Sequence, residues 1–323
     1  MVVPQSSPAP PGRKHEWLNS AGLQLTANPT LCSLLWPKAG ASGAAVPELP
    51  EMQALAERLD SAVAGSTLIG AQALQFSALK SFELAPESVV GQTVRSVGRR
   101  GKFLVIDLDE ARILAHLSQG GRVDVEDPPK TTRPKGAVVR LTFSAGSPSV
   151  LIREFGTERK AGWWVLGPGE DGPLKRLGPE PSSAEFADLI TTGADRRRLH
   201  TMLRNQATVA GLGRGHTDDI LHRAGLSPFA TLSSLTPTER QRLLAAVGCI
   251  LKAALDLERQ RRGGLPARLD NRFAIHGQAG TPCPKCGSDI RRVSYESYEV
   301  AYCPACQTKG HLLADRRMSK LLR

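Results

Sequence analysis

Hydrophobic residues follow two periods along the chain, and each period predicts a different kind of element. Met52, Leu55, Leu59 and Val63 recur at three- and four-residue spacing, so an amphipathic helix is predicted over residues 51–64. Short β-like runs come next, separated by Gly, Pro and Asp. Strands are predicted at residues 93–97, 103–108, 113–117, 137–143, 150–155 and 162–166. Many short strands with turn signals between them are typical of a β-sandwich or a barrel.

The pattern becomes helical in the second half of the chain. Residues 167–181 are rich in turn-forming residues, which indicates a linker between the two parts. Further on, Thr236 is placed to cap a helix, with Pro237 in the first turn and Glu239 where a capping box needs it. The apolar face that follows this start, from Leu243 to Leu255, is interpreted as core packing.

The first 46 residues differ from the rest. They contain six prolines and many Ser and Ala residues, and no hydrophobic period is sustained. Such a composition is typical of a disordered segment, or of one that is not translated in the native protein. The structured chain is therefore predicted to begin at Pro47.

Composition narrows the class of partner. The chain has 323 residues, 42 Lys and Arg against 31 Asp and Glu, and a formal net charge of +11. Such a surplus favours nucleic acid, because neutralising phosphates releases counterions, although simple solubility would also explain it. No apolar run reaches the roughly 18 residues needed to span a bilayer, and no signal peptide is evident. We therefore expect a protein of the bacterial cytoplasm, with no membrane partner.

Four of the six cysteines form a metal-site pattern near the C-terminus. Cys283 and Cys286 make one CxxC pair, and Cys303 and Cys306 make a second pair after sixteen intervening residues. Two such pairs can supply four thiolates to one tetrahedral Zn²⁺ and leave no open position for a catalytic water. One structural zinc is predicted here, with free thiols or a redox pair as the alternative. Basic residues around the site would suit phosphate contact.

Four ordered motifs carry a resemblance to a known family. Val46-Pro-Glu-Leu-Pro-Glu51 resembles the opening of the formamidopyrimidine-DNA glycosylases (the Fpg/Nei family), and Gly101-Lys-Phe-Leu104 resembles their Gly-Lys-Tyr/Phe-Leu hairpin. Residues 209–213, running on to 228, resemble the family's helix–two-turns–helix motif. The CxxC pairs resemble its zinc finger. The match covers residues 47–323.

The resemblance implies an α+β fold in three parts. After the extension at 1–46, it predicts an N-terminal helix with a β-sandwich over residues 47–178. A helix–two-turns–helix domain over 179–275 and a zinc-finger β-hairpin over 276–323 would follow. Damaged double-stranded DNA would lie in a basic cleft between the two halves, and we expect a monomer.

The resemblance also implies a reaction, namely removal of oxidised or ring-opened bases followed by cleavage at the abasic site. Pro47 would be the nucleophile, because in the family the matching residue is a free N-terminus, and a terminal amine has a pKa near 8 against roughly 10.4 for lysine. Glu48 would act as a general acid in opening the sugar, and Lys102 would hold a phosphate. The damaged base would first leave the stack. Alone, Pro47 and Pro50 would be read as the first turn of a helix.

As the sequence stands, Pro47 is internal, and an amide nitrogen is not a nucleophile. Val46 lies where the family has its initiating Met, and a GTG start codon reads as Val when it is translated internally. We therefore expect the native start at residue 46, with Met trimmed to expose Pro47. Removal of a transit peptide is the alternative.

Several positions depart from the family pattern at residues that contact DNA. Arg214 replaces an Asn that grips a phosphate, and Tyr298 replaces the arginine of the zinc finger. Gln119 aligns with an intercalating Met, while Phe155 or Arg159 could fill the space left by the flipped base. These changes leave the preferred lesion open. They also agree with a second interpretation, in which the chain is a DNA-binding protein of this fold without catalytic activity. A zinc-finger transcription regulator would leave the first two motifs unexplained.

Overall fold

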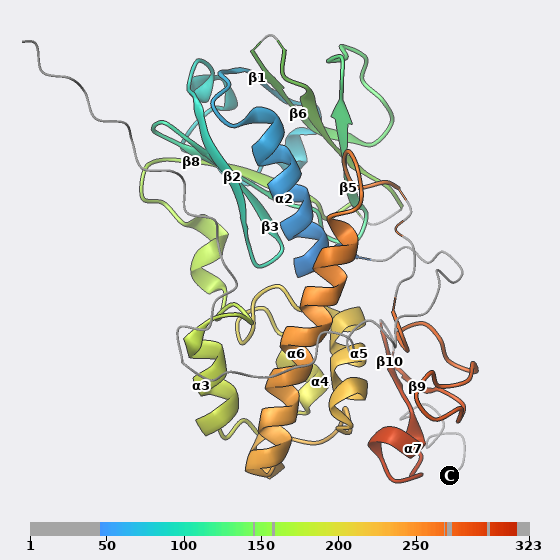
Figure 1. Cartoon of the computed structure of the whole chain (residues 1–323). Helices are drawn as coiled ribbons and strands as arrows, with labels where there is room; N and C mark the ends of the chain where they lie inside the picture. The colour runs from blue at the N-terminus through green and yellow to red at the C-terminus, as the bar shows by residue number, and fades with distance from the viewer. Residues whose placement is uncertain are drawn as a thin grey trace, which may run out of the picture.

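The computed structural model describes residues 46–144, 146–156, 159–267, 269, 273–295 and 298–314, so residues 1–45 of the predicted extension lie outside the described residues. The described residues form an upper half of strands and a lower half of helices, and helices α2 (Leu49–Val63) and α6 (Pro237–Glu258) meet where the halves join (Figure 1). Among these residues, no helix is long and apolar enough to cross a membrane. The predicted α+β class is confirmed.

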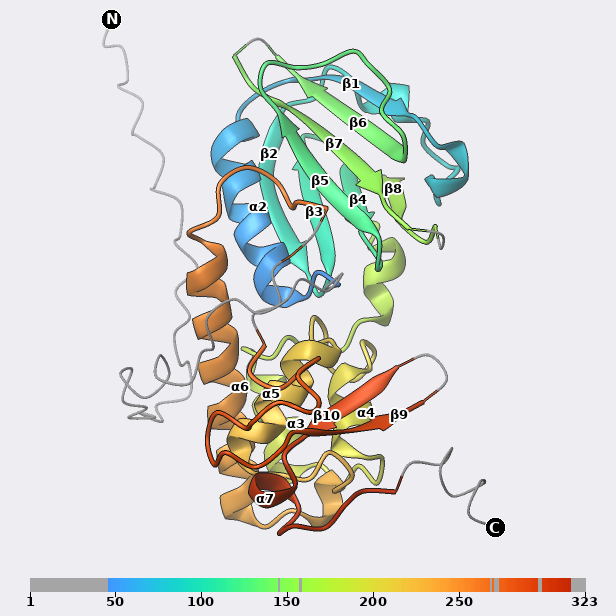
Figure 2. The same cartoon turned by 90° about the vertical axis from the view of Figure 1, so that its right-hand side faces the viewer.

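The upper half is a sandwich of two four-stranded antiparallel sheets with α2 against one side (Figure 2). One sheet has the order β1 (Leu68–Ala73), β6 (Ala137–Phe143), β7 (Ser149–Glu154) and β5 (Gly121–Glu126). The other has the order β2 (Val94–Arg100), β3 (Phe103–Leu108), β4 (Arg112–His116) and β8 (Gly162–Leu166). Short 3₁₀ helices occupy Phe76–Ala78, Pro86–Val89 and Gly172–Arg176, the last within the predicted linker.

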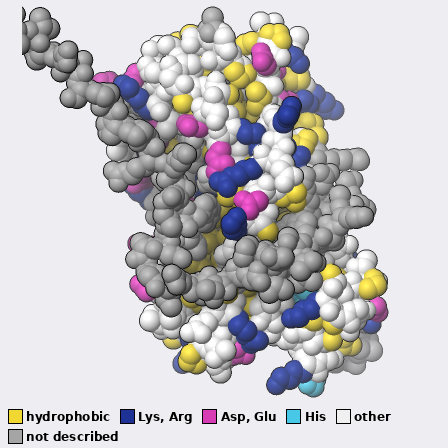
Figure 3. All heavy atoms as spheres, in the orientation of Figure 1, with side chains coloured by type: hydrophobic (Ala, Val, Ile, Leu, Met, Phe, Trp, Pro, Cys, Tyr) yellow, Lys and Arg dark blue, Asp and Glu magenta, His cyan; other side chains and the backbone are white. Residues whose placement is uncertain are grey.

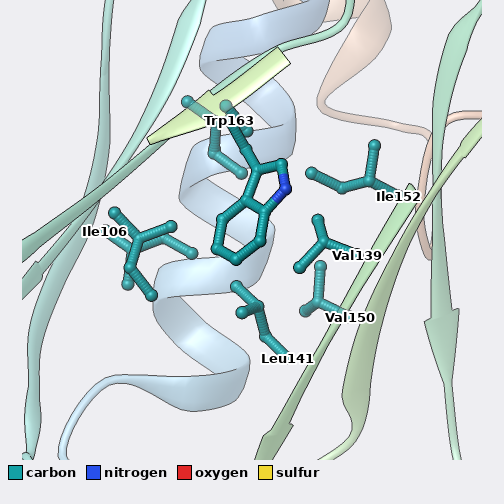
Figure 4. A pocket seen from close by; sticks show the side chains of 9 residues that line it. Ile106, Val139, Leu141, Val150, Ile152 and Trp163 are labelled. Atoms are coloured by element: carbon teal, nitrogen blue, oxygen red, sulfur yellow. The ribbon is translucent and has the colours of Figure 1, made fainter. Parts of the chain in front are cut away.

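The inner faces of the two sheets and α2 enclose one hydrophobic core. Trp163 is fully buried, and it lines a small internal pocket together with Ile106, Val139, Leu141, Val150 and Ile152 (Figure 4). Every lining side chain is hydrophobic, and the indole N–H of Trp163 lacks a hydrogen-bond partner among the described residues. We therefore assign this pocket to sandwich packing rather than to chemistry.

In the lower half, four helices form a second core, and a hairpin followed by a short helix has a smaller cluster of its own. Its elements are α3 (Ala184–Thr192), α4 (Leu199–Arg204), α5 (Arg214–Ala224), a 3₁₀ turn at Leu232–Ser234, α6, the hairpin β9 (Arg291–Ser294) with β10 (Glu299–Tyr302), and α7 (Pro304–Gln307). Helix α6 begins as predicted: Thr236 Oγ1 accepts from the Glu239 N–H at 3.3 Å, and Glu239 accepts from the Thr236 N–H at 2.9 Å.

The two halves are tied together at the start of α2 and at the end of α6. The Leu49 N–H donates to the Gly211 carbonyl at 3.0 Å, and the Leu49 side chain packs in the lower core although its helix lies in the upper half. At the other end, Arg259 pairs with Glu57 at 2.7 Å. After α6 the chain returns upward, where Leu265 exchanges backbone hydrogen bonds with Val123 of β5. The junction is therefore built from segments far apart in the sequence.

Candidate active site and metal centre

Glu48 is the central residue of the junction between the halves. It immediately precedes α2, it is only 3% exposed, and its side chain reaches the first turn of α5. There the carboxylate accepts hydrogen bonds from the backbone N–H of Gly213 at 2.6 Å and of Gly215 at 3.0 Å. The first amides of a helix have no partner within it and favour an anion. The N-terminus of a lower-half helix therefore binds an upper-half carboxylate. We call the backbone amides of Gly213 and Gly215 that bind it the Glu48 seat.

His216 supplies a third contact to the same carboxylate. Its Nδ1 lies 2.8 Å from Glu48 Oε2, and both side chains are buried. Burial alone would raise the pKa of Glu48, but the charges of His216 and Lys102 and the hydrogen bond from His216 outweigh it and lower the pKa to about 2. Burial alone would lower the pKa of His216, but Glu48 raises it to about 9. At neutral pH the pair is therefore a carboxylate beside an imidazolium.

Lys102 approaches Glu48 from the turn between β2 and β3. A Cβ added at Gly213 would lie 2.2 Å from the Glu48 carboxyl carbon and 2.6 Å from Lys102 Nζ, so both groups pack directly over this glycine. Burial lowers the pKa of Lys102 more than the Glu48 carboxylate raises it. The structure therefore brings two of the three predicted catalytic side chains onto one backbone position.

Glu180 holds the turn that carries Lys102. Its carboxylate accepts from Arg99 Nη1 at 2.7 Å, from Arg100 Nη1 at 2.8 Å and from the Gly101 N–H at 2.7 Å. Next to Glu180, the Pro179 carbonyl accepts from the Ala210 N–H at 2.9 Å. The segment predicted as a linker thus fixes the β2–β3 turn against the loop that leads to α5.

Pro47 is buried directly before Glu48, and in this chain its nitrogen belongs to the Val46–Pro47 peptide bond. The Glu48 N–H donates to Glu51 Oε2 at 2.9 Å in a capping box. Because of this cap, α2 begins at Leu49, two residues earlier than predicted. Pro50 lies in the first turn of α2, as the helix interpretation predicts, whereas Pro47 precedes the N-cap residue Glu48 and lies outside the helix.

The predicted DNA-contact residues lie at three separate places. Arg214 is the first residue of α5 and is half-buried beside the Glu48 seat. Gln119 is exposed in the turn before β5, and Arg159 is exposed in the loop after β7. That turn and that loop adjoin, since the Phe155 N–H donates to the Gly120 carbonyl at 2.8 Å.

Tyr298 lies in an aromatic stack at the β9–β10 hairpin. Its ring stacks on Tyr295 at 4.5 Å between centroids, and the Arg204 guanidinium lies over its face at 4.0 Å. His200 stacks at 6.2 Å. Arg204 and His200 belong to α4, so the hairpin is packed onto this helix. The Arg204 guanidinium therefore places a positive charge next to Tyr298 in the hairpin.

The C-terminal cysteines gather into a cluster that could hold a metal ion. One ligand atom each from Cys283, Cys303, Cys306 and His222 lie within 4.8 Å of one another. Cys286 is exposed and is not a member of this group, but its Sγ lies 3.4 Å from that of Cys303. Sulfur and imidazole donors without a carboxylate fit a soft or borderline cation such as Zn²⁺. The cluster fits the predicted metal, with His222 as an unexpected neighbour.

Sequence reasoning missed His216, His222 and the function of Gly213. All three lie on or next to α5, within the stretch 209–228 that resembles the helix–two-turns–helix motif. Only Gly213 belonged to a quoted motif, and a conformational reading of that glycine would not have revealed its packing against Glu48. The two histidines face partners 168 and 61 residues away in the chain, so no local spacing signals them.

Comparisons with known proteins agree with this geometry. The profile of the formamidopyrimidine-DNA glycosylase N-terminal domain matches residues 46–158, and that of the formamidopyrimidine-DNA glycosylase H2TH domain matches residues 177–263. The formamidopyrimidine-DNA glycosylases of Bacillus licheniformis and Thermus thermophilus are 31% and 33% identical to this chain. Each alignment covers 82% of this chain and 100% of the relative.

Solved structures show the same likeness. The crystal structure of the MutM (Fpg) protein of Thermus thermophilus matches with a TM-score of 0.69 and 29% identity, over 81% of this chain and 98% of that one. A complex of Lactococcus lactis Fpg with DNA containing an abasic site matches with a TM-score of 0.69 over 81% of this chain and 99% of that one. At 23% identity, this second likeness concerns the fold alone. With both profiles and full-length relatives in agreement, the chain belongs to the formamidopyrimidine-DNA glycosylase family.

Proposed function

We propose that this chain is a base-excision-repair DNA glycosylase that also cleaves the resulting abasic site, with Pro47 as the nucleophile. Family membership supports the glycosylase activity. The observation that carries the proposal is the seat of Glu48, where two backbone amides, His216 and Lys102 surround the carboxylate next to Pro47. A damaged duplex is the proposed partner, as in the Lactococcus lactis complex.

The proposed chemistry requires Pro47 as a free secondary amine. Its lone pair would attack C1′ of the deoxyribose and displace the base, which would take the N–H proton of the new ammonium. The electron pair freed on nitrogen would then form the iminium as the sugar ring opens. The profile match begins at residue 46, which supports a mature form that starts at Pro47. Initiation at Val46 with removal of Met would give this form, and processing of a longer chain would give it as well.

Lys102 and Arg214 are proposed to bind the phosphates that flank the damaged nucleotide. Both cations border the Glu48 seat, and the positive charge of Arg214 also acts to lower the pKa of Lys102. An anion between two neighbouring cations reduces the repulsion between their charges, and a phosphate would supply that anion. Arginine at position 214 would bind through charge where the family uses an amide.

The hairpin is proposed as a second DNA contact. Tyr298 lacks a charge, but Arg204 lies over its ring, and Arg204 Nε has no hydrogen-bond partner among the described residues. A guanidinium held flat on an aromatic ring is pre-organised for a phosphate. Gln119 and Arg159 stay proposed contacts for the space that a flipped base leaves, on adjoining segments of the upper half.

A structural zinc is proposed for the cysteine cluster, held by Cys283, Cys286, Cys303 and Cys306. When bound, the ion would cross-link the hairpin segment and supply no reactive water.

The proposed domains are residues 47–178, 179–275 and 276–323, and the proposed oligomeric state is a monomer. On this scheme, Leu265 of the second domain pairs with β5 of the first.

The test is borohydride trapping on a duplex that carries one abasic site, with the chain beginning at Pro47 beside the full-length chain. Only a free amine forms a reducible imine, so we expect the form beginning at Pro47 alone to crosslink. If neither form crosslinks while both bind the duplex, the protein is a damaged-DNA-binding member of the family without catalysis. If the full-length chain crosslinks, another amine such as Lys102 is the nucleophile, and the assignment of Pro47 fails.

A further inference from the structure

His216 is the only side chain that the described residues bring to hydrogen-bond distance of the Glu48 carboxylate. It occupies the first turn of α5, its side chain is 1% exposed, and its Nδ1 lies 2.8 Å from Oε2. The ring of Phe273 meets the imidazole edge-on at 5.1 Å between centroids. A Cβ at the neighbouring Gly215 would lie 2.2 Å from Phe273 Cζ, so the phenyl ring closes the His216 side of the site. The imidazole is therefore held in one position against Glu48.

This geometry raises a difficulty for the proposed reaction. Opening the sugar ring requires a proton for its ring oxygen, and Glu48 is the group proposed to deliver it. A carboxylate that accepts two backbone N–H groups at a helix N-terminus, and a third contact from an imidazole, is stabilised in its ionised form. Glu48 alone would thus reach the reaction without a proton.

We propose that His216 stores the proton that Glu48 delivers to the sugar. This inference rests on the proposed function and adds a residue to it. After attack, the Pro47 nitrogen passes its N–H proton to the departing base and so regains a lone pair. As the C1′–O4′ bond then breaks, its electron pair goes to O4′, and the nitrogen lone pair forms the second C=N bond of the iminium. O4′ takes a proton through the Glu48 carboxyl group, which takes one from His216 Nδ1, and the imidazolium becomes neutral. His216 never touches the sugar, so it is a positioning residue that acts through Glu48.

The charges around the pair favour this distribution of the proton. Carboxylates face His216 from two elements, Glu48 and Glu51 from the start of α2 and Asp219 from α5, and together they favour the imidazolium. Lys102 from the β2–β3 turn and His276, next to Phe273, act on Glu48 and favour its ionised form. Asp218 is engaged by His276 Nδ1 at 2.7 Å and by the Ala301 N–H at 3.2 Å. The pair therefore holds one proton at neutral pH, and that proton resides on His216.

The first experiment measures the pair without any reaction. Imidazole nitrogen resonances of the ¹⁵N-labelled, zinc-loaded full-length chain are followed from pH 5 to 10, and His216 is assigned with H216Q. We expect a midpoint near 9 for His216, and a midpoint well below 9 in E48Q, because burial lowers the pKa of His216 once the Glu48 charge is removed. A midpoint near 6.5 in the unmodified chain would overturn the proposal, whatever trapping shows.

The second experiment measures the reaction in the form that traps the abasic site. Single-turnover imine formation is followed from pH 6 to 10 for the unmodified protein, H216Q and H276Q. We expect the unmodified rate to fall above about pH 9, and H216Q to be about 100-fold slower with that alkaline fall absent, at unchanged duplex affinity. H276Q, which alters a histidine that hydrogen-bonds Asp218 rather than Glu48, should keep the alkaline fall.

The outcomes separate a proton store from a structural contact. Glutamine keeps an N–H donor toward Glu48 but carries no titrating proton. If H216Q keeps the unmodified rate, or becomes slow while the same alkaline fall persists, His216 does not store the proton. If no form traps the abasic site, the proposed function fails, while the resonance experiment still decides whether the Glu48–His216 pair exists.

Discussion

At the residue scale, Gly213 provides a backbone donor and a space that only glycine leaves open. Its N–H binds Glu48, and the space that a Cβ would occupy holds the Glu48 carboxyl group and Lys102 Nζ. We predict that Gly213→Ala lowers the rate of imine formation at least 100-fold, because a displacement of about 1 Å in a catalytic group costs this much. Gly248→Ala is the control: it lies exposed in α6 with nothing within 4 Å of its added Cβ, and it should gain about 0.5–1 kcal/mol in stability. Equal activity in both variants would contradict the prediction.

The Glu48–His216 pair also predicts how stability depends on pH. Folding raises the pKa of His216 from 6.5 to about 9, so the stabilisation is complete below pH 6.5 and is lost as pH rises toward 9. Folding lowers the pKa of Glu48 from 4.5 to about 2. The stabilisation that the Glu48 carboxylate contributes is therefore present above pH 4.5 and is lost as pH falls toward 2. Denaturant unfolding from pH 6 to 10 should show a difference between the unmodified chain and H216Q that shrinks with rising pH. A constant difference would rule this linkage out.

Sequence reasoning reached the residues of the site that lie in recognisable motifs and stopped there. Pro47, Glu48 and Lys102 stand in two short motifs, and the structure brings the latter two together. Their companions come from α5, whose residues read as an ordinary helical stretch. The proximity of His216 to Glu48 is a product of tertiary packing, which no spacing along one chain expresses.

At the element scale, strong local signals predicted elements well and weak ones failed. Strands β3, β6 and β8 have the predicted bounds, and α6 begins at its predicted capping box. Strands β1 and β5 were missed. The β1 sequence Leu-Ile-Gly-Ala-Gln-Ala has little β propensity, and pairing with β6 makes it a strand. The β5 sequence Gly-Arg-Val-Asp-Val-Glu does alternate, but only Val123 and Val125 of its six residues are large and apolar, so its signal is short.

The contacts of Glu180 with Arg99, Arg100 and the Gly101 N–H, called the Glu180 clamp here, are predicted to stabilise the β2–β3 turn that carries Lys102. Glu180→Ala leaves Arg99, whose side chain is 7% exposed, without its ion-pair partner, and should cost about 2–3 kcal/mol of unfolding free energy. Lys252→Ala is the matched control, because it breaks an exposed ion pair on α6 worth about 0.3–0.5 kcal/mol. Urea unfolding of both variants measures the difference. Similar losses would mean that the clamp adds little.

Arg204 is predicted to be the cation of the hairpin contact. Arg204→Ala should weaken duplex binding about tenfold and reduce the slope of log affinity against log salt by about one, as expected when one phosphate contact is lost. Arg197→Ala is the control: it alters an arginine just before α4 that pairs with Asp195 rather than with the hairpin. An unchanged salt slope in the Arg204 variant would assign this side chain to packing.

At the scale of the whole molecule, the chain consists of two cores that meet at the Glu48 site and a small hairpin with little core of its own. Lys and Arg side chains are found on both halves of the face in Figure 3. The resemblance predicted the division into halves. The interlocking of the halves through Leu49 and Leu265 could not be predicted, because it joins segments far apart in sequence.

Metal removal is predicted to affect one part of the molecule. A hairpin whose core is a few residues and its cysteines would depend on the proposed zinc for its fold. A strong chelator should therefore remove amide-exchange protection from the described residues between 283 and 307 and weaken duplex binding. The sandwich has its own core and should keep its protection. His222→Phe, which removes the contact of 3.2 Å with Cys283, should retain zinc with an affinity lowered about 10- to 100-fold. Complete loss of zinc in this variant would make His222 a ligand.

The position of the site at the junction of the two halves determines which forms of the chain could carry the proposed activity. Glu48 belongs to one half, while the amides and imidazole that seat it belong to the other, so neither half contains the proposed reactive centre alone. A nascent chain that has folded only its sandwich, or a proteolytic fragment of either half, would be unable to open a sugar ring. The proposed cleavage of the DNA backbone would therefore be absent until the whole chain is synthesised and its two halves are docked.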